Sequence, residues 1–478
     1  MTQRTVDIAI IGAGSAGMTA YRAARKHTNN LVVIESGPYG TTCARVGCMP
    51  SKLLIAAAEA AHAVREAPRF GLKASLDAVD GAAVMQRVRD ERDRFVNFVV
   101  NTVEDWPEAH RLRGHARFVR PGVLAVGDDE VHARCIIIAT GSSPKVPDDW
   151  RTSLSTRLVI NDDVFNWTTL PASVAVVGTG IIGLELAQAL ALLGIRVRLL
   201  GRNGRVGPLT DPALQALSHT LVKSSLALSA SAQSLEVERG GDGVVVRFED
   251  AGGVHEETFE YLLAATGRHP NLDGLDVEKA GIQRDDKGRI HFNRETQQIG
   301  DLPVFIAGDV HGLRPLLHEA SDDGRLAGDN AATWPNIVQR PRRAPLAIVF
   351  SQPQIMMAGA SHAELTAQKV DFATGTVSFN KQGRARVMCV NRGALHVYGE
   401  HGSGRFLGAE MIGPAAEHLG HLLAWSVQAE LTVQQMLDSP FYHPVIEEGL
   451  RTALRDLQGQ LRVDKVATEP CIDCEVAP

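Results

Sequence analysis

Chain length, composition and charge already exclude several classes of protein. The chain has 478 residues, of which 44% are hydrophobic and 22% charged, and its formal net charge is −6. This is the composition of an ordinary soluble protein, long enough for about two to four domains. The negative charge argues against nucleic acid or an anionic membrane surface as a partner. No apolar run approaches the roughly 20 residues of a membrane span, and no apolar signal segment begins the chain, so a cytoplasmic protein is expected.

The first predicted strand, residues 6–11, leads into a glycine-rich loop and an alanine-rich helix, and a second predicted strand ends at Glu35. The loop has the spacing GxGxxG. Its first glycine permits a tight turn, its second lets a pyrophosphate approach the backbone, and its third allows close packing of helix on strand. These glycines are Gly12, Gly14 and Gly17. Glu35 follows the last of them by 18 residues, where a carboxylate can accept hydrogen bonds from a ribose. The pattern predicts a dinucleotide site.

Two cysteines, Cys43 and Cys48, follow shortly after this loop. Residues five apart on a regular helix point about 140° away from each other, whereas a disulfide needs Cα atoms within roughly 4.4–6.8 Å. The segment is therefore predicted to be a distorted turn entering a helix, with Gly47 supplying backbone freedom. A helix N-terminus would stabilise a thiolate, and Lys52 lies on the same helical face as Cys48. The spacing suggests a dithiol that exchanges electrons with the predicted cofactor.

Other interpretations of the cysteines are a zinc half-site or two core residues. No nearby His/Cys cluster completes a tetrahedral site, so no metal is expected. Six cysteines are also too few for a secreted scaffold held by disulfides.

The glycine-loop pattern recurs after a predicted strand at residues 173–177, and another predicted strand follows at 196–200. The glycines of this second loop are Gly178, Gly180 and Gly183. At the same 18-residue offset stands Gly201 rather than an acid, followed by Arg202 and, close by, Arg205. Losing the carboxylate removes the partner of a free 2′-hydroxyl, and guanidinium groups bind phosphate. NADPH is therefore favoured over NADH. The alternative is that the arginines are solvated and NADH is used.

The segment Gly40-Thr-Thr-Cys-Ala-Arg-Val-Gly-Cys-Met-Pro-Ser-Lys52 resembles the redox-active disulfide motif of the class I pyridine nucleotide–disulfide oxidoreductases. Further matches follow in the family's order at residues 114–118, 136–141, 264–271, 304–309 and 349–353. Most similar are the dihydrolipoamide dehydrogenases. The sequence departs from the family's pattern at Thr41, where a second glycine is usual, and at Ala44-Arg45 in place of Leu-Asn.

This resemblance implies an α/β fold with two Rossmann-like dinucleotide-binding domains, one for FAD and one for NAD(P), and a C-terminal α/β interface domain. The expected domains are residues 1–148 and 271–345 for FAD, 149–270 for NAD(P), 346–460 for the interface, and 461–478 as a flexible tail. Within the interface domain, residues 387–390 are predicted as a strand and 415–429 as a long helix.

The resemblance also assigns roles. FAD would be bound by Gly12, Gly14, Gly17, Glu35, Gly141 and Asp309. The pyridine nucleotide would lie on the opposite flavin face, held by Gly178, Gly180, Gly183 and Arg202, with Gly267 also at the cofactors. Lys52 would sit at the flavin and pair with Glu185. Cys48 would be the thiolate beside the flavin, and Cys43 the thiol that exchanges with the substrate.

Near the C-terminus, His443 precedes Glu448 by five residues. Thiol–disulfide exchange needs a group that accepts and returns a proton, and histidine suits this because its ordinary pKa is about 6.5. The carboxylate would orient the ring. By resemblance this is the family's catalytic dyad, contributed by the neighbouring subunit, which implies a homodimer. It disfavours mercuric reductases, which lack the histidine.

The substrate stays open. His318-Glu319-Ala320 resembles a segment of the dihydrolipoamide dehydrogenases, whereas the features at Gly201 favour NADPH. The alternatives are a lipoamide-type substrate, free or on a lipoyl domain, and NADPH-driven reduction of another disulfide. Cys471/Cys474 in the tail could relay electrons, bind a metal, regulate, or be incidental. A further class is a redox-sensing or lipoyl-domain-binding subunit.

Overall fold

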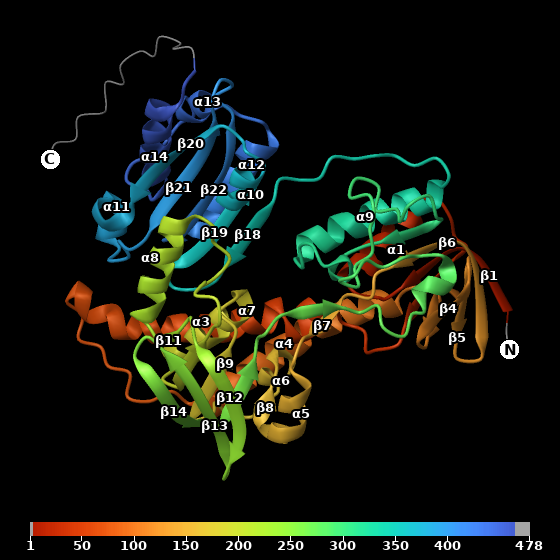
Figure 1. Ribbon diagram of the computed structural model, residues 1–478, viewed down its shortest axis with the longest axis horizontal. Helices are drawn as coiled ribbons and strands as arrows, with labels where there is room; N and C mark the ends of the chain where they lie inside the picture. The colour runs from red at the N-terminus through yellow and green to blue at the C-terminus, as the bar shows by residue number, and fades with distance from the viewer. Residues whose placement is uncertain (1–2, 464–478) are drawn as a thin grey trace. The chain divides into compact units, whose positions relative to one another are not determined.

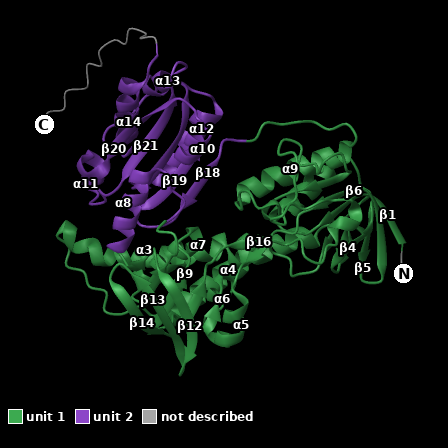
Figure 2. Cartoon of the chain, in the orientation of Figure 1, with its two compact units in different colours: residues 1–205, 225–342 green, residues 206–224, 343–478 purple. Residues whose placement is uncertain are grey.

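The computed structural model describes residues 3–463 and separates into two compact units (Figure 2). The first unit comprises Met1–Arg205 and Ser225–Arg342. The second comprises Val206–Ser224 and Arg343–Pro478. Residues 206–224, which follow the second glycine loop along the chain, thus pack with the C-terminal residues rather than with the sheet that precedes them.

A seven-stranded sheet forms the first core of unit 1, in the order β3-β2-β1-β6-β5-β4 with β17 also paired to β6. Its strands are β1 (Gln3–Ile11), β2 (Leu31–Glu35), β3 (Arg111–Arg113), β4 (Ala116–Arg120), β5 (Val123–Val126), β6 (Asp129–Ile138) and β17 (Val304–Ile306). β1 pairs in parallel with β2 and β6, and β4 and β5 continue as an antiparallel meander. The apolar run of β1 is therefore buried in the middle of the sheet.

Helices α1 (Ser15–Ala24) and α9 (Leu317–Thr333) lie side by side against this sheet (Figure 1). Their close approach depends on glycine. A Cβ atom at Gly324 would lie 2.1 Å from the carbonyl oxygen of Ala16, and one at Gly328 would lie 2.4 Å from that of Ala20. The helix that begins at the first glycine loop is thereby held against the helix that follows Asp309.

The second sheet of unit 1 is parallel, in the order β11-β10-β9-β15-β8. Its strands are β8 (Leu158–Val159), β9 (Ser173–Val177), β10 (Arg196–Leu200), β11 (Ala227–Ser229) and β15 (Tyr261–Ala264). Helix α7 (Ile181–Leu192) follows β9, and an antiparallel sheet of β12 (Gln233–Gly240), β13 (Gly243–Asp250) and β14 (Gly253–Phe259) precedes β15. Two short strands, β7 (Ser142–Pro144) and β16 (Arg268–Pro270), pair where the chain leaves and re-enters the first core.

The remaining helices of unit 1 are α2 (Thr42–Val46), α3 (Cys48–Glu66), α4 (Gly81–Glu104), α5 (Asp148–Leu154) and α6 (Asn161–Val164). Helix α3 contacts both α4 and α7, so the helix that starts at Cys48 reaches the helix that starts after the second glycine loop. None of the helices between residues 3 and 463 combines the length and the apolar character needed to cross a membrane.

Unit 2 is built on an antiparallel sheet in the order β18-β19-β22-β21-β20. Its strands are β18 (Leu346–Val349), β19 (Gln354–Gly359), β20 (Phe372–Ser378), β21 (Ala394–Glu400) and β22 (Phe406–Gly413). Its helices are α8 (Pro212–Lys223), α10 (His362–Ala367), α11 (Gly383–Val387), α12 (Ala416–Gln428), α13 (Val433–Leu437) and α14 (Glu447–Gln460). Leu419 and Leu423 of α12 and the leucines of α14 are buried in one core with the sheet.

The fold class predicted from the sequence is confirmed, and so is the long helix, observed as α12. The predicted strand at residues 387–390 is wrong. Val387 ends α11, which Gln382 caps by accepting from the N–H of Ala385, and Cys389 has a left-handed backbone with φ of 56°. Val387 and Met388 are exposed, so this apolar run has no sheet face to pack on. The next strand begins at Ala394.

Candidate active site

The two glycine loops have the same geometry, glycine by glycine. A Cβ atom at Gly12 would lie 2.4 Å from the carbonyl oxygen of Ala139, and one at Gly178 would lie 2.1 Å from that of Ala265. The third glycines are packed as tightly, since a Cβ at Gly17 would lie 1.9 Å from the oxygen of Gly12. The second glycines, Gly14 and Gly180, face open space, with no atom within 4 Å of an added Cβ. Each loop thus leaves its backbone open at the position that a pyrophosphate approaches.

Glu35 closes the first loop at the end of β2. Its Oε2 accepts a hydrogen bond of 2.8 Å from the N–H of Ala13, and its Oε1 accepts one of 2.7 Å from the N–H of Gly37. The carboxylate is therefore fixed at the mouth of the loop, where a ribose of a bound dinucleotide would meet it.

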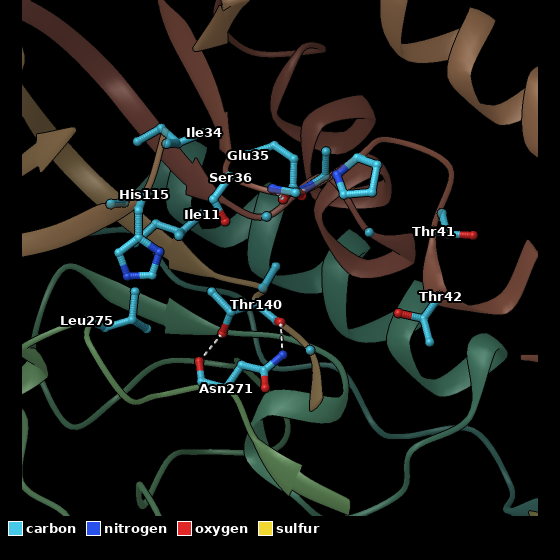
Figure 3. A pocket seen from close by; sticks show the side chains of 18 of the residues that line it. Ile11, Ile34, Glu35, Ser36, Thr41, Thr42, His115, Thr140, Asn271 and Leu275 are labelled. Atoms are coloured by element: carbon cyan, nitrogen blue, oxygen red, sulfur yellow. Dashed lines mark hydrogen bonds between the residues drawn. The ribbon is translucent and has the colours of Figure 1, made fainter. Parts of the chain in front are cut away.

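A cavity of about 430 Å³ lies beside this loop (Figure 3). Among the residues that line it are Gly12, Gly14, Glu35, His115, Gly141 and Asn271. Two reciprocal hydrogen bonds join Thr140 and Asn271 in one wall of the cavity. The Thr140 hydroxyl donates to the Asn271 carbonyl at 2.7 Å, and the Asn271 side-chain amide donates to the Thr140 carbonyl at 2.9 Å. His115 and Asn271 were not singled out from the sequence as cofactor-contacting residues, although they stand in the segments 114–118 and 264–271 that carry the family resemblance.

Asp309 lies at the end of β17, at the start of a short 3-10 helix (Asp309–His311). Its Oδ2 accepts a hydrogen bond of 3.0 Å from the Ser142 hydroxyl, which in turn accepts one of 2.8 Å from Nε of Arg268. Asp309 is thus oriented from the β7–β16 connection. Gly267, which begins the return through β16, has a φ of 111°, a conformation that favours glycine.

The thiol segment is the distorted entry to a helix that the spacing of the cysteines predicts. Cys43 lies in the short helix α2, and Cys48 is the first residue of α3. A Cβ atom at Gly47 would lie 3.1 Å from the oxygen of Thr42 and 3.2 Å from Cα of Cys43, so glycine lets the two turns pack closely without displacing either neighbour. Thr41, with φ of 57°, occupies the left-handed region, and its hydroxyl accepts from the N–H of Ala44 at 3.2 Å.

Cys43 is half-buried and Cys48 is exposed, and in the reduced pair the two thiols are hydrogen-bonded to each other. The hydrogen bond from Cys43, followed by the positive charge of Lys52, lowers the pKa of Cys48 to about 7. The same hydrogen bond, together with burial, raises the pKa of Cys43 far above its ordinary value. Cys48 is therefore the thiolate of the pair near neutral pH, at the N-terminus of α3 where the helix dipole favours negative charge.

Lys52 and Glu185 form the ion pair that the sequence predicts. The Lys52 ammonium donates to Oε2 of Glu185 at 2.8 Å, and the Glu185 side chain is only 5% exposed. This contact joins α3, which begins at Cys48, to α7, which begins after the second glycine loop. It places a cation one helical turn from the Cys48 thiol.

His443 and Glu448 also lie together, in unit 2. Nδ1 of His443 is 2.9 Å from Oε1 of Glu448, whose Oε2 accepts from the N–H of Val445 at 3.1 Å. Partial burial raises the pKa of Glu448, but the hydrogen bonds from His443 and Val445 outweigh it and keep that pKa below its ordinary value. Glu448 is thus an anion that binds Nδ1 and leaves Nε2 of the 78% exposed imidazole for an external partner.

Two other groups of residues were singled out from the sequence. Arg202 and Arg205 are exposed beside Gly201. Cys471 and Cys474 lie outside the described residues. Between residues 3 and 463, no group of three or more His, Cys, Asp or Glu side chains is arranged to hold a metal ion.

Comparison with known proteins decides the family. Residues 6–324 match the family described as pyridine nucleotide-disulphide oxidoreductase, and residues 346–454 match the dimerisation domain of that family. The chain belongs to the pyridine nucleotide-disulphide oxidoreductases. This confirms the resemblance seen in the sequence and implies binding of FAD and of a pyridine nucleotide. The open second glycine of each loop, the fixed Glu35 and the adjoining cavity fit such ligands.

The relatives within this family differ in substrate. The chain is 30% identical to a mercuric reductase of Streptomyces lividans, over 94% of this chain and 95% of the relative. It is also 30% identical to a mycothione reductase of Mycobacterium tuberculosis, over 95% of this chain and the whole relative. It is 29% identical to a dihydrolipoyl dehydrogenase of Thermus scotoductus, over 96% and 98%. The expectation that the dyad disfavours mercuric reductases stays a prediction.

Solved structures share the fold. LpdA from Mycobacterium tuberculosis superposes with a TM-score of 0.78 at 24% identity, over 95% of this chain and 99% of that one. An HOCl-induced flavoprotein disulfide reductase from Escherichia coli gives the same TM-score and identity, over 95% and 99%. At this level of identity the likeness extends to the fold only.

Proposed function

We propose that this oxidoreductase interconverts the Cys43/Cys48 dithiol and disulfide, with a lipoamide-type compound as the exchanging substrate. The observation that carries the proposal is the unequal pair of thiols at the start of α3. Cys48 has a pKa lowered to about 7 beside the Lys52–Glu185 ion pair, whereas Cys43 keeps its proton. FAD, when bound, would pass an electron pair between the nicotinamide and this dithiol.

The exchange with the substrate is carried by the sulfur atoms. In the reducing direction, Cys43 loses its proton and attacks the substrate disulfide, which forms a mixed disulfide and releases one substrate thiolate. Cys48 then attacks the sulfur of Cys43, closes the Cys43–Cys48 bond and releases the second substrate thiolate. Oxidation of a substrate dithiol is the same sequence reversed.

His443 would accept and return the proton of this exchange. Its Nδ1 is bound by Glu448, so the free Nε2 is the basic atom, and the anion behind it stabilises the imidazolium. Because the dyad lies in the residues that match the family's dimerisation domain, we propose that it serves the thiols of a second copy of the chain. Exposed apolar side chains in the same unit support a homodimer. They include Leu422 and Trp425 of α12 and Tyr442, the last 80% exposed.

A second candidate function is the NADPH-driven reduction of another disulfide. It is supported by Gly201, which replaces the ribose-binding acid, and by the mycothione reductase among the relatives. At the position of the lysine in the His-Lys-Ala segment of dihydrolipoamide dehydrogenases stands Glu319, whose Oε2 accepts from Arg342 at 2.9 Å. This segment therefore differs in charge from the one it resembles.

An acceptor panel separates these functions. The FAD-loaded protein is mixed with NADH or NADPH and with lipoamide, glutathione disulfide, mycothiol disulfide or an oxidised thioredoxin. Turnover of lipoamide above all other acceptors supports the first function, and turnover of another disulfide with NADPH supports the second. Mercuric ion is included because of the mercuric reductase relatives. Absence of thiol–disulfide turnover with every disulfide would favour a redox-sensing or binding subunit.

A further inference from the structure

The two glycine loops of unit 1 can be compared residue by residue, because their glycines occupy matching positions. Two positions differ. Between the first and second glycine stands Ala13 in one loop and Thr179 in the other. Eighteen residues after the third glycine stands Glu35 in one loop and Gly201 in the other. In the first loop these two positions touch, since the N–H of Ala13 donates to the Glu35 carboxylate at 2.8 Å.

In the second loop the same two positions touch in a different way. A Cβ atom at Gly201 would lie 2.7 Å from Cγ2 and 2.8 Å from Oγ1 of Thr179, and 2.8 Å from the carbonyl oxygen of Ala230. Real Cβ atoms do not approach other heavy atoms this closely. Thr179 is itself buried, with 8% of its surface exposed. The Thr179 side chain and the Ala230 carbonyl therefore together occupy the space that a side chain at position 201 would need.

Thr179 also fixes the turn that carries the arginines. Its hydroxyl donates to the carbonyl oxygen of Arg205 at 2.6 Å. The N–H of Gly204 donates to the Ala230 carbonyl at 2.9 Å, and the N–H of Arg205 donates to the side chain of Asn203 at 3.2 Å. These three hydrogen bonds fix the backbone of the turn, while the side chains of Arg202 and Arg205 remain exposed.

We propose that Thr179 and Gly201 together set the choice of nucleotide in favour of one with a 2′-phosphate. The threonine side chain keeps a ribose-binding carboxylate out of the loop, and its hydroxyl holds the turn that offers Arg202 and Arg205 to the phosphate. A guanidinium binds a phosphate by paired, charge-assisted hydrogen bonds, and a carboxylate at the same place would repel it. This inference rests on the NADPH preference in the second proposed function and assigns it to a residue pair.

The test uses calorimetric binding of adenosine 2′,5′-bisphosphate and adenosine 5′-monophosphate to the full-length, FAD-loaded protein. These fragments lack the nicotinamide, so the readout is independent of turnover. The wild type is expected to bind the bisphosphate at least about tenfold more tightly, the size of one charge-assisted hydrogen bond. Thr179→Val keeps the volume and removes the hydroxyl. Its preference for the bisphosphate is expected to fall by about three- to tenfold, with binding of the monophosphate unchanged.

The charge and the volume of the side chains at positions 179 and 201 are tested by introducing residue types of the first loop into the second loop. Gly201→Glu alone is expected to weaken both ligands, because Thr179 blocks the new side chain. Thr179→Ala combined with Gly201→Glu copies the Ala13/Glu35 residue types and removes the threonine part of the block, with the Ala230 carbonyl still close to the new side chain. It is expected to bind the monophosphate more tightly than Gly201→Glu alone. Bound-flavin absorbance and thermal unfolding report whether each variant is folded. If the double variant does not fold, Thr179→Val decides alone.

The possible results distinguish a failure of the role given to Thr179 and Gly201 from a failure of the NADPH preference on which that role depends. A wild type that does not prefer the bisphosphate removes the NADPH preference itself. A wild type that prefers it while Thr179→Val keeps the full preference overturns the role of the threonine hydroxyl and leaves NADPH in place. A single Gly201→Glu variant that binds the monophosphate as tightly as the double variant overturns the steric role of Thr179.

Discussion

The Lys52 ammonium lies 2.8 Å from the carboxylate of Glu185, and this pair joins the helix that begins at Cys48 to the helix that follows the second glycine loop. Glu185 is almost fully buried, so its charge needs a partner. The pair acts on Cys48 with opposite signs, because the Lys52 charge lowers the pKa of that thiol and the Glu185 charge raises it.

Lys52→Met is therefore expected to raise the pKa of Cys48 above about 7, because the stabilising cation is lost. Glu185→Gln is the matched control and is expected to lower the same pKa. The measurement is the rate at which Cys48 of the reduced protein is alkylated by iodoacetamide as a function of pH, with the modified peptide identified by mass spectrometry. Shifts of the same sign in both variants would contradict this electrostatic account.

Cys43 is the stronger influence on Cys48. In the reduced wild type, Cys48 is expected to be protonated below and a thiolate above a pH of about 7, so its alkylation rate rises through that value. Cys43→Ala removes the hydrogen-bond donor and is expected to move this transition upward, toward the ordinary cysteine value of about 8.5. Cys43→Ser keeps a donor and is expected to shift the transition less. Equal shifts in the two variants would rule out the hydrogen bond as the cause.

The glycine loops, the thiol turn and the Lys52–Glu185 and His443–Glu448 pairs could all be predicted from the sequence. Each rests on a residue type that local geometry demands, such as Gly12 against the Ala139 carbonyl, or on a motif that carries a family resemblance. The strand expected at residues 387–390 was wrong because apolar, β-branched residues indicate a strand only when a sheet is there to bury them. Here Val387 is 63% exposed.

Contacts between distant segments that no family motif marks could not be predicted from the sequence. Glu410 accepts from the N–H groups of Thr210 and Asp211 at 2.5 and 3.0 Å, although these residues are about 200 positions away along the chain. No local pattern marks such a pair. The Thr179–Gly201 contact could not be predicted for a similar reason. The absence of a side chain at position 201 becomes informative only when the structure shows that Thr179 lies beside that position.

Asp211 offers a test of unit 2. It caps α8, and its Oδ2 is 2.8 Å from Nδ1 of His396. Burial raises its pKa, but the His396 interaction and the capping N–H groups outweigh this and lower the pKa to about 2. Since this pKa is below the unfolded value of about 3.9, the stabilisation is complete above about pH 4 and is lost as the pH falls through about 2.

Asp211→Ala is accordingly expected to lower the free energy of unfolding by about 2 kcal/mol at neutral pH, because a helix cap and the partner of the half-buried His396 imidazole are both lost. Asp211→Asn keeps an oxygen for the cap and is expected to cost less. Denaturant unfolding at pH 7 and at pH 3 measures both. An alanine variant as stable as the wild type at pH 7 would show that this contact does not stabilise unit 2.

His443→Gln is expected to reduce disulfide turnover by about a hundredfold or more, as for loss of a general acid–base, while reduction of the flavin by the nucleotide stays fast. Glu448→Gln is expected to lose less activity, because the ring stays in place and loses only the anion that orients it. Stopped-flow spectroscopy separates the two half-reactions. Equal slowing of both would point to a structural effect.

The dimer is tested by complementation. Homodimers of His443→Gln and of Cys43→Ser are each expected to be inactive. Heterodimers formed by unfolding and refolding the mixture would combine the intact thiols of one chain with the intact histidine of the other. Half of the dimers would be mixed, with one good site each, which restores about a quarter of the sites. No recovery from a mixture shown to contain heterodimers would mean that the histidine acts within its own chain.

Cys43 and Cys48 are expected to form the dithiol that the pyridine nucleotide reduces. The most direct measurement is alkylation of the FAD-loaded full chain before and after anaerobic addition of NADPH or, in a parallel sample, NADH, with each cysteine quantified by mass spectrometry. The expected result is that Cys43 and Cys48 are unreactive before reduction and both are modified after it, while Cys135 and Cys389 do not change. Modification of Cys43 and Cys48 to the same extent with and without nucleotide would contradict the account.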